Sequence, residues 1–573
     1  MRYRWAIASP QLDLASTLAR QLGIAPLLAQ CLLNRGLCDP ERIARFIEPR
    51  LKHLADPFLL PNMAAAVARL VAARARNEPL VIFGDYDVDG VTATALLVEV
   101  LGTLGWTVHH YLPHRIDEGY GLTQAGVENC LQRFAVKLLL AVDCGSKASP
   151  TMQWLRERGV DVVVLDHHQV SSPAPEVAAL VNPQLAAADA PNFRELCSAG
   201  LAFKLAHALV KYGRGENWPG AAGFDLRPWL DLVALGTISD LVPLTGENRI
   251  FVAAGLSSLN RTTRPGLVAL KKVANITGPT GGYEVGFQLG PRLNAAGRLE
   301  TALAALRLLL TQDMAEAQTL AATLDAQNKE RQAIEREIVD DVLARVREKF
   351  KGEEDFVIVE GDPGWHIGVV GIVASRVVQE FYRPTIIFGG DGEHWRGSGR
   401  SIEGFDLAAA LRHCDDALIR HGGHAMAAGM TIDPARVDDF RKRFNELAHK
   451  TLKREQLQPA LRIDAQVTAA ELTWDLLKQL ERLQQTGMGN PPVQLMLRNV
   501  CRQRPSQRVG AEKKHLKSWV TDGVTTREVI WWNAGEEELP SGTFDLAFTP
   551  QLAEFNGTVG VQLRLLDFRS AQD

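Results

Sequence analysis

The sequence predicts an α/β protein in which two α/β domains are joined by a long helix and followed by an all-β barrel. Three patterns indicate this fold class. Short apolar runs alternate with helical segments in the first half, one long helical pattern without glycine or proline follows, and short alternating strands fill the end of the chain. At roughly 150 residues per domain, the length also suggests about three or four domains.

The first α/β domain is expected at residues 51–310. Its predicted strands are the apolar runs LVIFG, TVHHYLP, KLLLAVDCG and DVVVLDHHQ, which begin at residues 80, 107, 137 and 161. The segments between them have helical patterns, such as VTATALLVEVLGTLG. Apolar strands separated by amphipathic helices are typical of a parallel sheet with helices on both faces.

The rest of the chain divides into four segments. Residues 311–350 keep apolar side chains at helical spacing and predict a connecting helix, and the strands of the last segment are joined by Gly, Asn and Pro turns. We expect an N-terminal helical segment at residues 1–50 and the connecting helix at residues 311–350. A second α/β domain is expected at residues 351–453, and a barrel like the oligonucleotide-binding (OB) fold at residues 454–573.

Composition indicates a globular protein without a bulk charge that would attract nucleic acid. The net charge is -4 and the pI is about 6.4, so binding to nucleic acid would have to rest on local basic patches. The seven cysteines are scattered without a CxxC pair, which favours reduced thiols over a disulfide framework or a zinc ribbon. With no apolar core of a signal peptide and no apolar run near the ~18 residues of a membrane helix, we expect a cytoplasmic protein that does not bind membranes.

Four short segments carry acidic and histidine side chains in a pattern that suggests a metal site. GDYDVDG, AVDCG and LDHHQ, which begin at residues 84, 141 and 165, each follow an apolar strand, and TISDLVP at residue 237 follows a helical run. Ligands of open parallel sheets bind beyond the carboxyl ends of the strands. We therefore expect one edge of the sheet to gather Asp85, Asp87, Asp89, Asp143, Asp166, His167, His168 and Asp240.

So many carboxylates cannot lie together as bare anions, because like charges raise one another's pKa and destabilise the fold. Divalent cations would resolve this conflict, and carboxylates with one or two imidazoles suit Mn²⁺ or Mg²⁺ better than zinc. Two such ions close together form an arrangement that cleaves phosphodiesters. Each motif alone could be a turn with side-chain capping. The occurrence of all four on one domain favours the metal site.

The segment DHH at residues 166–168 is the signature of the DHH phosphoesterase superfamily, which this sequence resembles. Within that superfamily the sequence is similar to the RecJ family in VIFGDYDVDGVTAT, HRIDEGYGL, GPRLNAAGRL, GWHIGVVGIVASR, GSGRSIEGFDL and GGHAMAAG. The likeness extends from about residue 50 to the end of the barrel. It implies a DHH catalytic domain, a DHH-associated (DHHA1) domain and an OB-fold domain at residues 51–310, 351–453 and 454–573. Cys144 departs from the family, where asparagine is common, but it follows the expected ligand rather than replacing it.

The resemblance also implies roles for the clustered side chains. Two divalent cations, Mn²⁺ or Mg²⁺, would be held by Asp87, Asp89, Asp143, His167 and Asp240, with Asp143 bridging them. Asp85 would act from behind the ligands, His168 would contact the scissile phosphate or assist proton transfer, and Asp166 would orient a histidine ring. Water activated between the cations would attack phosphorus in line, without a covalent intermediate.

Three glycine-rich segments, GPRLNAAGR, GSGR and GGHAMAAG, are predicted to be loops that bind phosphate, since glycine lets backbone N–H groups approach closely. We expect Ser398 and Arg400 to hold a 5′-terminal phosphate, with Arg115 nearby. Further contacts to the strand are expected from Arg292, Asn294, Arg298 and His424. An anchored 5′ phosphate predicts 5′→3′ digestion to 5′-mononucleotides, because each cut leaves a new 5′ phosphate.

Two features suggest how a single strand would be held. A basic run at residues 498–519 is opposed in sequence only by Glu512, and it predicts a phosphate track, although a solvated loop is the alternative. The track residues are Arg502, Arg504, Arg508, Lys513, Lys514 and Lys517. Bases could stack on Tyr120, Trp365, His366 and Phe405, for which simple packing is the alternative.

The resemblance implies single-stranded DNA with a 5′ end as the substrate, a monomeric enzyme of recombinational and mismatch repair, and single-strand-binding protein and a helicase as helpers. The sequence has no GxxxxGK[ST] loop, so we expect no use of ATP. Two other functions remain open: a DHH phosphodiesterase acting on short oligonucleotides or cyclic dinucleotides, and a non-catalytic binding module. The barrel and the second α/β domain favour the exonuclease, because a small substrate needs no extended track.

Overall fold

The structure is a computed structural model that describes residues 3–115, 117–119, 121–186, 193–299, 301–352, 354–390, 392–555 and 558–571. Two compact units make up the chain. The parallel-sheet unit comprises Gln11–Asn328 and Asp475–Val493. The barrel unit comprises Met1–Pro10, Lys329–Trp474 and Gln494–Asp573.

The parallel-sheet unit is built on five parallel strands in the order β3-β2-β4-β5-β6. They are β2 (Leu80–Gly84), β3 (Val108–Tyr111), β4 (Leu138–Val142), β5 (Asp161–Leu165) and β6 (Ala179–Val181). The three central strands are apolar and almost wholly buried, as expected for strands covered on both faces. The prediction of a parallel sheet in this domain is therefore confirmed.

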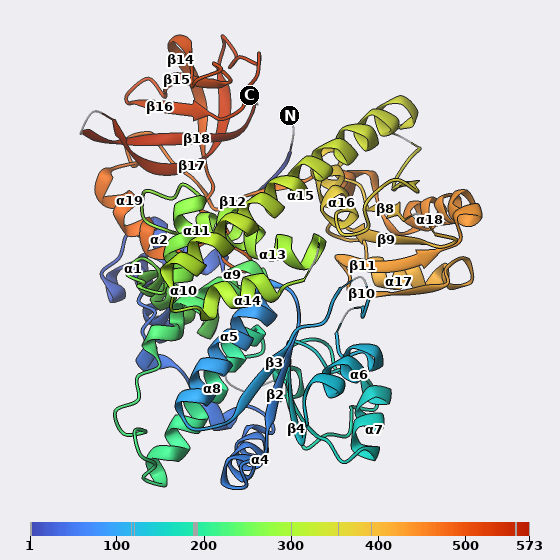
Figure 1. The fold of residues 1–573 in the computed structure, drawn as a ribbon. Coiled ribbons are helices and arrows are strands. Elements are labelled where there is room, and N and C mark those ends of the chain that lie inside the picture. The colour runs from blue at the N-terminus through green and yellow to red at the C-terminus, as the bar shows by residue number, and fades with distance from the viewer. Residues whose placement is uncertain are drawn as a thin grey trace. The chain divides into compact units, whose positions relative to one another are not determined.

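Helices cover both faces of this sheet (Figure 1). On one face, Ile82 and Leu140 pack in a core with α4 (Met63–Ala75), α5 (Val88–Thr103) and α8 (Ser198–Gly215). On the other face, Phe83 and Leu139 pack with α6 (Gln124–Arg133) and α7 (Ser149–Glu157). Because successive strand residues point to opposite faces, each strand contributes to both cores.

Further helices complete the parallel-sheet unit. They are α1 (Leu12–Leu22), α2 (Pro26–Asn34), α3 (Pro40–Ile47), α9 (Leu230–Ser239), α10 (Gly246–Leu259), α11 (Pro265–Val273), α12 (Gly282–Glu284), α13 (Gly290–Leu299) and α14 (Leu303–Leu310), with a π-helical turn, η5 (Val285–Leu289), before α13. The late segment Asp475–Val493 returns to this unit, where the buried Arg249 donates to the carbonyls of Arg482 at 2.8 Å and Gln484 at 2.6 Å. Burial lowers the pKa of Arg249 to about 10.

The predicted connecting helix is present as α15 (Met314–Lys349), an uninterrupted helix that begins in one unit and ends in the other. Beyond it, the second α/β domain has a mixed sheet in the order β10-β11-β9-β8-β7. Its elements are β7 (Ile358–Asp362), α16 (Val370–Phe381), β8 (Thr385–Gly389), β9 (Trp395–Arg400), α17 (Leu407–His413), β10 (Arg420–Gly423), β11 (Ala427–Ile432) and α18 (Val437–Thr451). Only β7 and β8 are parallel among these neighbours.

Two of the three glycine-rich segments are not loops, so the prediction is wrong for them, and the third contains only the short turn between two strands. GPRLNAAGR forms helix α13, GSGR ends strand β9, and GGHAMAAG spans strands β10 and β11. Close packing is the physical reason for the glycines of the first two segments. A Cβ on Gly297 would come within 2.8 Å of the carbonyl oxygen of Tyr86, and one on Gly397 within 2.4 Å of the Phe388 ring.

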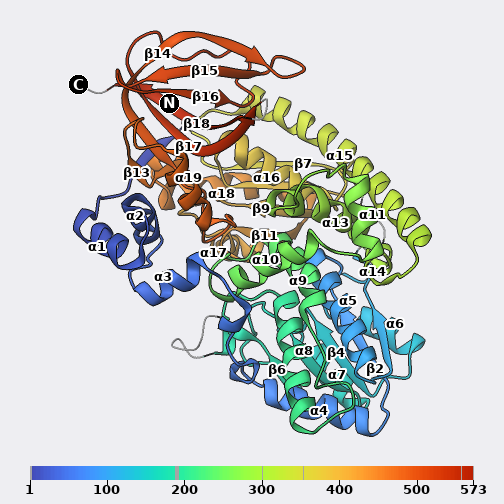
Figure 2. The same cartoon turned by 90° about the vertical axis from the view of Figure 1, so that its left-hand side faces the viewer.

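The chain ends in a closed five-stranded barrel, as predicted (Figure 2). Strands β14 (Leu495–Val509), β15 (His515–Thr521), β16 (Thr526–Trp531), β18 (Thr558–Ser570) and β17 (Phe544–Phe555) pair in that order, and β14 also pairs with β17. The short β13 (Ala465–Gln466) adds to β14, and α19 (Trp474–Leu480) precedes the barrel.

One strand lies where the sequence predicted only helices. Strand β1 (Arg4–Ile7) pairs in parallel with β12 (Ala460–Ile463). Trp5 Nε1 donates to Asp567 Oδ2 at 2.8 Å, so the beginning of the chain is bound to the barrel. Such a long-range pairing of one short strand leaves no local periodicity to detect.

No single helix among the described residues is long and apolar enough to cross a membrane, whereas the bent pair Leu51–Leu59 and Met63–Ala75 passes by length and composition alone.

The central strand β4 offers a test of the core. Leu140 is fully buried, so Leu140→Ala should lower the free energy of unfolding by about 2–5 kcal/mol. The thermal unfolding midpoint should fall accordingly. Leu12→Ala is the control because Leu12 is exposed, and equal midpoints for the two variants would contradict this packing.

Candidate metal centre

The acidic and histidine side chains follow the carboxyl ends of neighbouring strands. Asp85 follows β2, Asp143 follows β4 and Asp166 follows β5. Their backbones continue the sheet, because Asp85 N donates to Val142 O at 3.2 Å and Asp143 N donates to Leu165 O at 3.0 Å. Asp240 joins them from the C-terminal end of α9. The predicted convergence at one sheet edge is therefore present.

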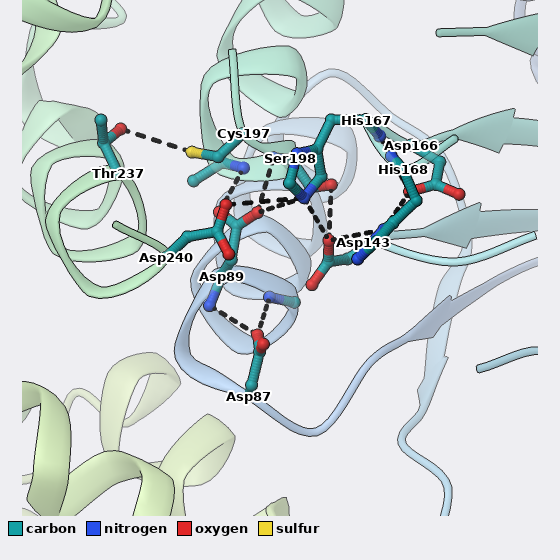
Figure 3. A network of polar contacts seen from close by, with 12 residues as sticks. Asp87, Asp89, Asp143, Asp166, His167, His168, Cys197, Ser198, Thr237 and Asp240 are labelled. Atoms are coloured by element: carbon teal, nitrogen blue, oxygen red, sulfur yellow. Dashed lines mark hydrogen bonds and ion pairs between the residues drawn. The ribbon is translucent and has the colours of Figure 1, made fainter. Parts of the chain in front are cut away.

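Three groups of these side chains could each hold a metal ion, because the ligand atoms within each group lie within 4.8 Å of one another. The groups are Asp143 with His167 and His168, Asp89 with His167 and Asp240, and Asp85 with Asp87 and Asp143. Figure 3 shows the residues of the first two groups. His167 Nε2 lies 3.4 Å from Asp143 Oδ1 and 3.5 Å from Asp240 Oδ2. Asp143 and His167 thus belong to more than one group.

The GDYDVDG segment is held by a tight strand-to-helix turn. Asp87 caps α5, since its Oδ1 accepts hydrogen bonds from Asp89 N at 2.9 Å and Gly90 N at 3.1 Å. Gly90 must be a glycine here, because a Cβ would come within 2.6 Å of the carbonyl oxygen of Asp85. This turn brings Asp85 and Asp89 onto the same edge as Asp143.

Asp166 holds the histidine pair. Its Oδ1 accepts from the backbone N–H groups of His167 at 2.8 Å and His168 at 3.1 Å, and it bonds His168 Nδ1 at 2.8 Å. Burial opposes its ionisation, but the hydrogen bond and charge of His168 outweigh burial, so the pKa of Asp166 lies below the usual range. Burial likewise opposes protonation of His168, and its bond to Asp166 overcomes burial and raises the pKa of His168.

The other carboxylates are electrostatically frustrated. Burial and then the charge of Asp87 raise the pKa of Asp85 to about 8 and that of Asp89 to about 6. Burial and neighbouring carboxylates also raise the pKa values of Asp143 and Asp240. Both oxygens of Asp85 are buried without a hydrogen-bond partner among the described residues. This donor set therefore fits divalent cations, which supply the missing positive charge.

The backbone is strained at two positions in this site. Asp143 and Leu241 have φ values of 63° and 59°, in the left-handed region that costs a side chain other than glycine about 1–3 kcal/mol. Aspartate tolerates this conformation better than leucine does. Leu241 directly follows Asp240. The surrounding structure therefore keeps Asp240 in place although the backbone beside it is strained.

The residues expected to contact DNA in the parallel-sheet unit mostly have partners inside the protein. Asn294 Oδ1 accepts from Val88 N at 3.1 Å, and Arg292 Nε bonds Asp325 Oδ1 at 2.9 Å. Arg115 lies over the Tyr86 ring at 5.3 Å, while Arg298 shares helix α13 with Arg292 and Asn294. Asn294 thus holds the start of α5, next to the acidic turn.

In the barrel unit, Ser398 and Arg400 lie together on β9, where Arg400 Nη1 donates to Ser398 Oγ at 3.0 Å. Both side chains lie against the first turn of α16. A Cβ on Gly371 would come within 2.9 Å of Ser398 Oγ and 3.2 Å of Arg400 Nη2. The Ser398 hydroxyl, the Arg400 guanidinium and the N-terminus of α16 therefore lie close together, as in a binding site for an anion. His424 is exposed in the turn between β10 and β11.

The basic run of the barrel is more neutralised than its sequence suggests. Arg502 and Arg508 each lie 3.3 Å from Glu538, Lys517 lies 2.7 Å from Glu528, and Lys514 pairs with Glu512. The expectation that only Glu512 opposes the run is wrong, because barrel closure brings in acids that are distant in sequence. Arg504 lies over the Trp519 ring at 3.5 Å, and Lys513 is exposed.

Two of the expected stacking residues, Trp365 and Phe405, are buried, and two other aromatic residues are exposed. Trp365 and Phe405 are buried in the core of the barrel unit, His366 accepts a hydrogen bond from Gly368 N, and Tyr120 lies outside the described residues. Tyr283 and Phe287 are 63% and 71% exposed, and their rings stack 5.1 Å apart. Their i, i+4 spacing was the available sequence signal.

Asn182 is a further residue of the site region that the sequence did not reveal. It follows β6, and its Nδ2 donates to Ser146 Oγ and to His168 O, both at 2.8 Å. It therefore ties the loop after β4 to the loop after β5. A polar residue directly after the apolar run ALV was its only signal.

Comparison with protein families agrees with this architecture. Residues 79–237 match the DHH family, N-terminal domain, residues 354–450 match the DHHA1 domain, and residues 463–567 match the RecJ OB domain. The fold and the acidic edge of the sheet thus define a protein of the DHH class.

Several curated proteins are similar over nearly the whole chain. Each is described as single-stranded-DNA-specific exonuclease RecJ. The Bacillus subtilis protein is 37% identical over 99% of this chain and 71% of its own length, and the Escherichia coli protein is 34% identical over 94% of this chain and 95% of its own. The chain belongs to the RecJ family of single-stranded-DNA-specific exonucleases.

Two similar solved structures were determined in complex with metal ions. A crystal structure of RecJ from Thermus thermophilus in complex with Mn²⁺ has a TM-score of 0.85 and 31% identity, covering 100% of this chain and 80% of that one. A second, in complex with Mg²⁺, has a TM-score of 0.79 and 29% identity, covering 100% and 79%. The cofactors expected from the sequence, Mn²⁺ or Mg²⁺, agree with these relatives and with the donor groups of this chain.

The raised pKa values predict proton release on cation binding. Because the pKa of Asp85 is about 8 and that of Asp89 about 6, bound protons must leave when a cation binds. We expect apparent Mn²⁺ affinity to increase between pH 6 and pH 8, with net proton release at pH 7. Titration calorimetry in two buffers of different ionisation enthalpy measures both.

Without a cation, the stability of the fold should change with pH in the opposite direction to the Mn²⁺ affinity: it should fall as the pH rises. The pKa values of these carboxyls are raised above the ordinary 3.8, so the folded state binds more protons than the unfolded state and loses stability as pH rises from about 4 to about 8. Saturating Mn²⁺ should remove most of that loss. Mn²⁺ affinity that does not change with pH would contradict the assignment.

Proposed function

We propose that this chain hydrolyses single-stranded DNA from the 5′ end and releases 5′-mononucleotides, using two divalent cations. The observation that carries the proposal is the set of three donor groups, two of which contain Asp143 and two of which contain His167. Shared ligands would keep two cations close together, as phosphodiester cleavage by two metals requires. Family membership supports single-stranded DNA as the substrate.

The proposed ligands are Asp87, Asp89, Asp143, His167 and Asp240. When bound, two such cations lower the pKa of an attacking water and neutralise charge on the phosphate. The protein's own contribution is orientation. Asp166 bonds His168 through Nδ1, so Nε2 is the ring atom directed to a phosphate oxygen. The raised pKa of His168 favours the protonated ring, which can donate to that oxygen. Asp85 would support the ligands from behind.

The 5′ end would be anchored by Ser398 and Arg400 beside the first turn of α16. The guanidinium gives a two-pronged donor, the hydroxyl adds a third donor, and the helix N-terminus favours an anion. Gly371 keeps this place open, because a side chain there would collide with both Ser398 and Arg400. Arg115, Arg292, Asn294, Arg298 and His424 remain proposed contacts to the strand.

This anchor would set the direction of digestion. Cleavage of the P–O3′ bond releases a 5′-mononucleotide and leaves the remaining strand with a 5′ phosphate. That new end has the same chemistry as the old one, so it fits the same anchor and the reaction can repeat.

The rest of the strand would be held by the exposed Tyr283–Phe287 pair and by the barrel. Stacked, solvent-exposed rings bind bases without sequence preference. The proposed track comprises Arg502, Arg504, Arg508, Lys513, Lys514 and Lys517. Because several of these cations have acidic partners, DNA phosphates would have to displace ion pairs there, and we expect a modest contribution from this face.

The biological setting follows from the family. We propose a monomeric cytoplasmic enzyme of recombinational and mismatch repair that uses no ATP, works beside a helicase that opens duplex DNA, and meets single-strand-binding protein on its substrate. A preference for di- or trinucleotides over long 5′-phosphorylated strands would instead favour the short-substrate phosphodiesterase.

Removal of the shared carboxylate tests the metal proposal. Asp143→Ala should reduce Mn²⁺-dependent release of mononucleotides to the level measured with EDTA. In EDTA its thermal unfolding midpoint should stay close to that of the unmodified protein, because the relief of carboxylate repulsion is offset by the lost hydrogen bond from Ser198. The exposed Asp438→Ala is the control, and unchanged turnover in Asp143→Ala would remove the two-cation site.

The anchor is tested by Arg400→Ala. Loss of a charge-assisted hydrogen bond should reduce the preference for a 5′-phosphate over a 5′-hydroxyl strand by about 10- to 100-fold. Cleavage rates on the two end-labelled strands measure that ratio, and Mn²⁺ affinity should stay the same. Arg443→Ala, which removes an exposed guanidinium paired with Asp416, is the control. Equal cleavage of both strands by the unmodified protein would contradict the anchor.

A further inference from the structure

Helix α8 begins directly at the acidic cluster. The backbone N–H of Ser198, its first residue, donates to Asp89 Oδ2 at 2.6 Å, and the N–H of Ala199 donates to Asp89 Oδ1 at 2.8 Å (Figure 3). Asp89 is buried, so its charge depends on such donors. The N-terminus of this 18-residue helix therefore holds both oxygens of the carboxylate.

The side chain of the same serine reaches a second carboxylate. Ser198 Oγ donates to Asp143 Oδ1 at 2.9 Å, and Ser198 is fully buried. Asp89 comes from the start of α5 and Asp143 from the end of β4. One residue on a third element thus contacts both through separate atoms, its backbone N–H and its hydroxyl.

Neighbouring residues pack tightly against the start of α8 and the Asp89 side chain. Gly236 of α9 packs against them so closely that a Cβ would come within 2.5 Å of Ala199 Cβ and 2.8 Å of Asp89 Oδ1. The position of Asp89 is therefore set by the packed helices α5, α8 and α9, and the Ser198 hydroxyl ties Asp143, which follows β4, to the same helices. A hydroxyl bond to Oδ1 also restricts rotation of the Asp143 carboxylate, which already carries a left-handed backbone conformation.

We infer that Ser198 is a positioning residue of the cation site, which fixes the carboxylates of Asp89 and Asp143 relative to each other. This inference rests on the proposed function, in which both carboxylates are ligands. A neutral hydroxyl stabilises a carboxylate without adding charge, so it orients Asp143 without competing for the cation. Groups that orient ligands in this way typically change metal affinity about 10- to 100-fold when removed.

Ser198→Ala separates the two contacts, because it removes the hydroxyl bond to Asp143 and keeps the N–H bond to Asp89. We expect the apparent Mn²⁺ Kd, measured by calorimetry without DNA, to rise about 10- to 100-fold. The unfolding midpoint in EDTA should change little, whereas the Mn²⁺-induced increase in midpoint should shrink. Ser198→Gly, which removes the hydroxyl together with Cβ, should show the same loss, and Ser198→Thr should recover affinity because it keeps the hydroxyl.

Ser518→Ala is the matched control, since Ser518 is a buried serine in the barrel with a hydrogen bond to Ser506. Its Mn²⁺ affinity should equal that of the unmodified protein. Unchanged Mn²⁺ affinity in both Ser198→Ala and Ser198→Gly would overturn the inference and leave the proposed nuclease standing. The proposed function fails separately, if the unmodified protein binds Mn²⁺ and releases no mononucleotides.

Discussion

Repulsion among buried carboxylates is the constraint on which the structure depends. Asp85, Asp89, Asp143 and Asp240 lie at one edge of a parallel sheet, where burial and one another's charges raise their pKa values. Such a cluster is unfavourable in a cation-free protein. It becomes favourable when divalent cations bind, so the fold stores an electrostatic cost that metal binding relieves.

The surrounding elements keep the acidic side chains together despite their mutual repulsion. Asp87 caps α5, the N-terminus of α8 holds Asp89, and Asp166 pairs with His168. Gly90 lets the backbone of Asp85 approach, and Gly236 makes room for the side chains of Ala199 and Asp89. These contacts come from three helices and two strand ends, so the ligands are placed by rigid packing rather than by one flexible loop.

The charged residues of the barrel unit are arranged differently from those of the acidic cluster. Several basic residues of β14 and β15 pair with Glu528 or Glu538, so part of the positive charge of these strands is neutralised within the protein. The place formed by Ser398, Arg400 and the first turn of α16 concentrates donors instead. In the proposed function, the anchor at the 5′ end would therefore contribute more to recognition than the barrel would.

The sequence by itself determined the parallel sheet, the long helix, the barrel and the acidic motifs, because apolar periodicity and strand-end position are local properties. It could not show that GPRLNAAGR is a helix, that Trp365 is buried, or that Glu538 neutralises Arg508. It also gave no sign of Ser198, which acts through partners more than fifty positions away in both cases. Those facts depend on which distant segments pack together, and only the tertiary structure decides that.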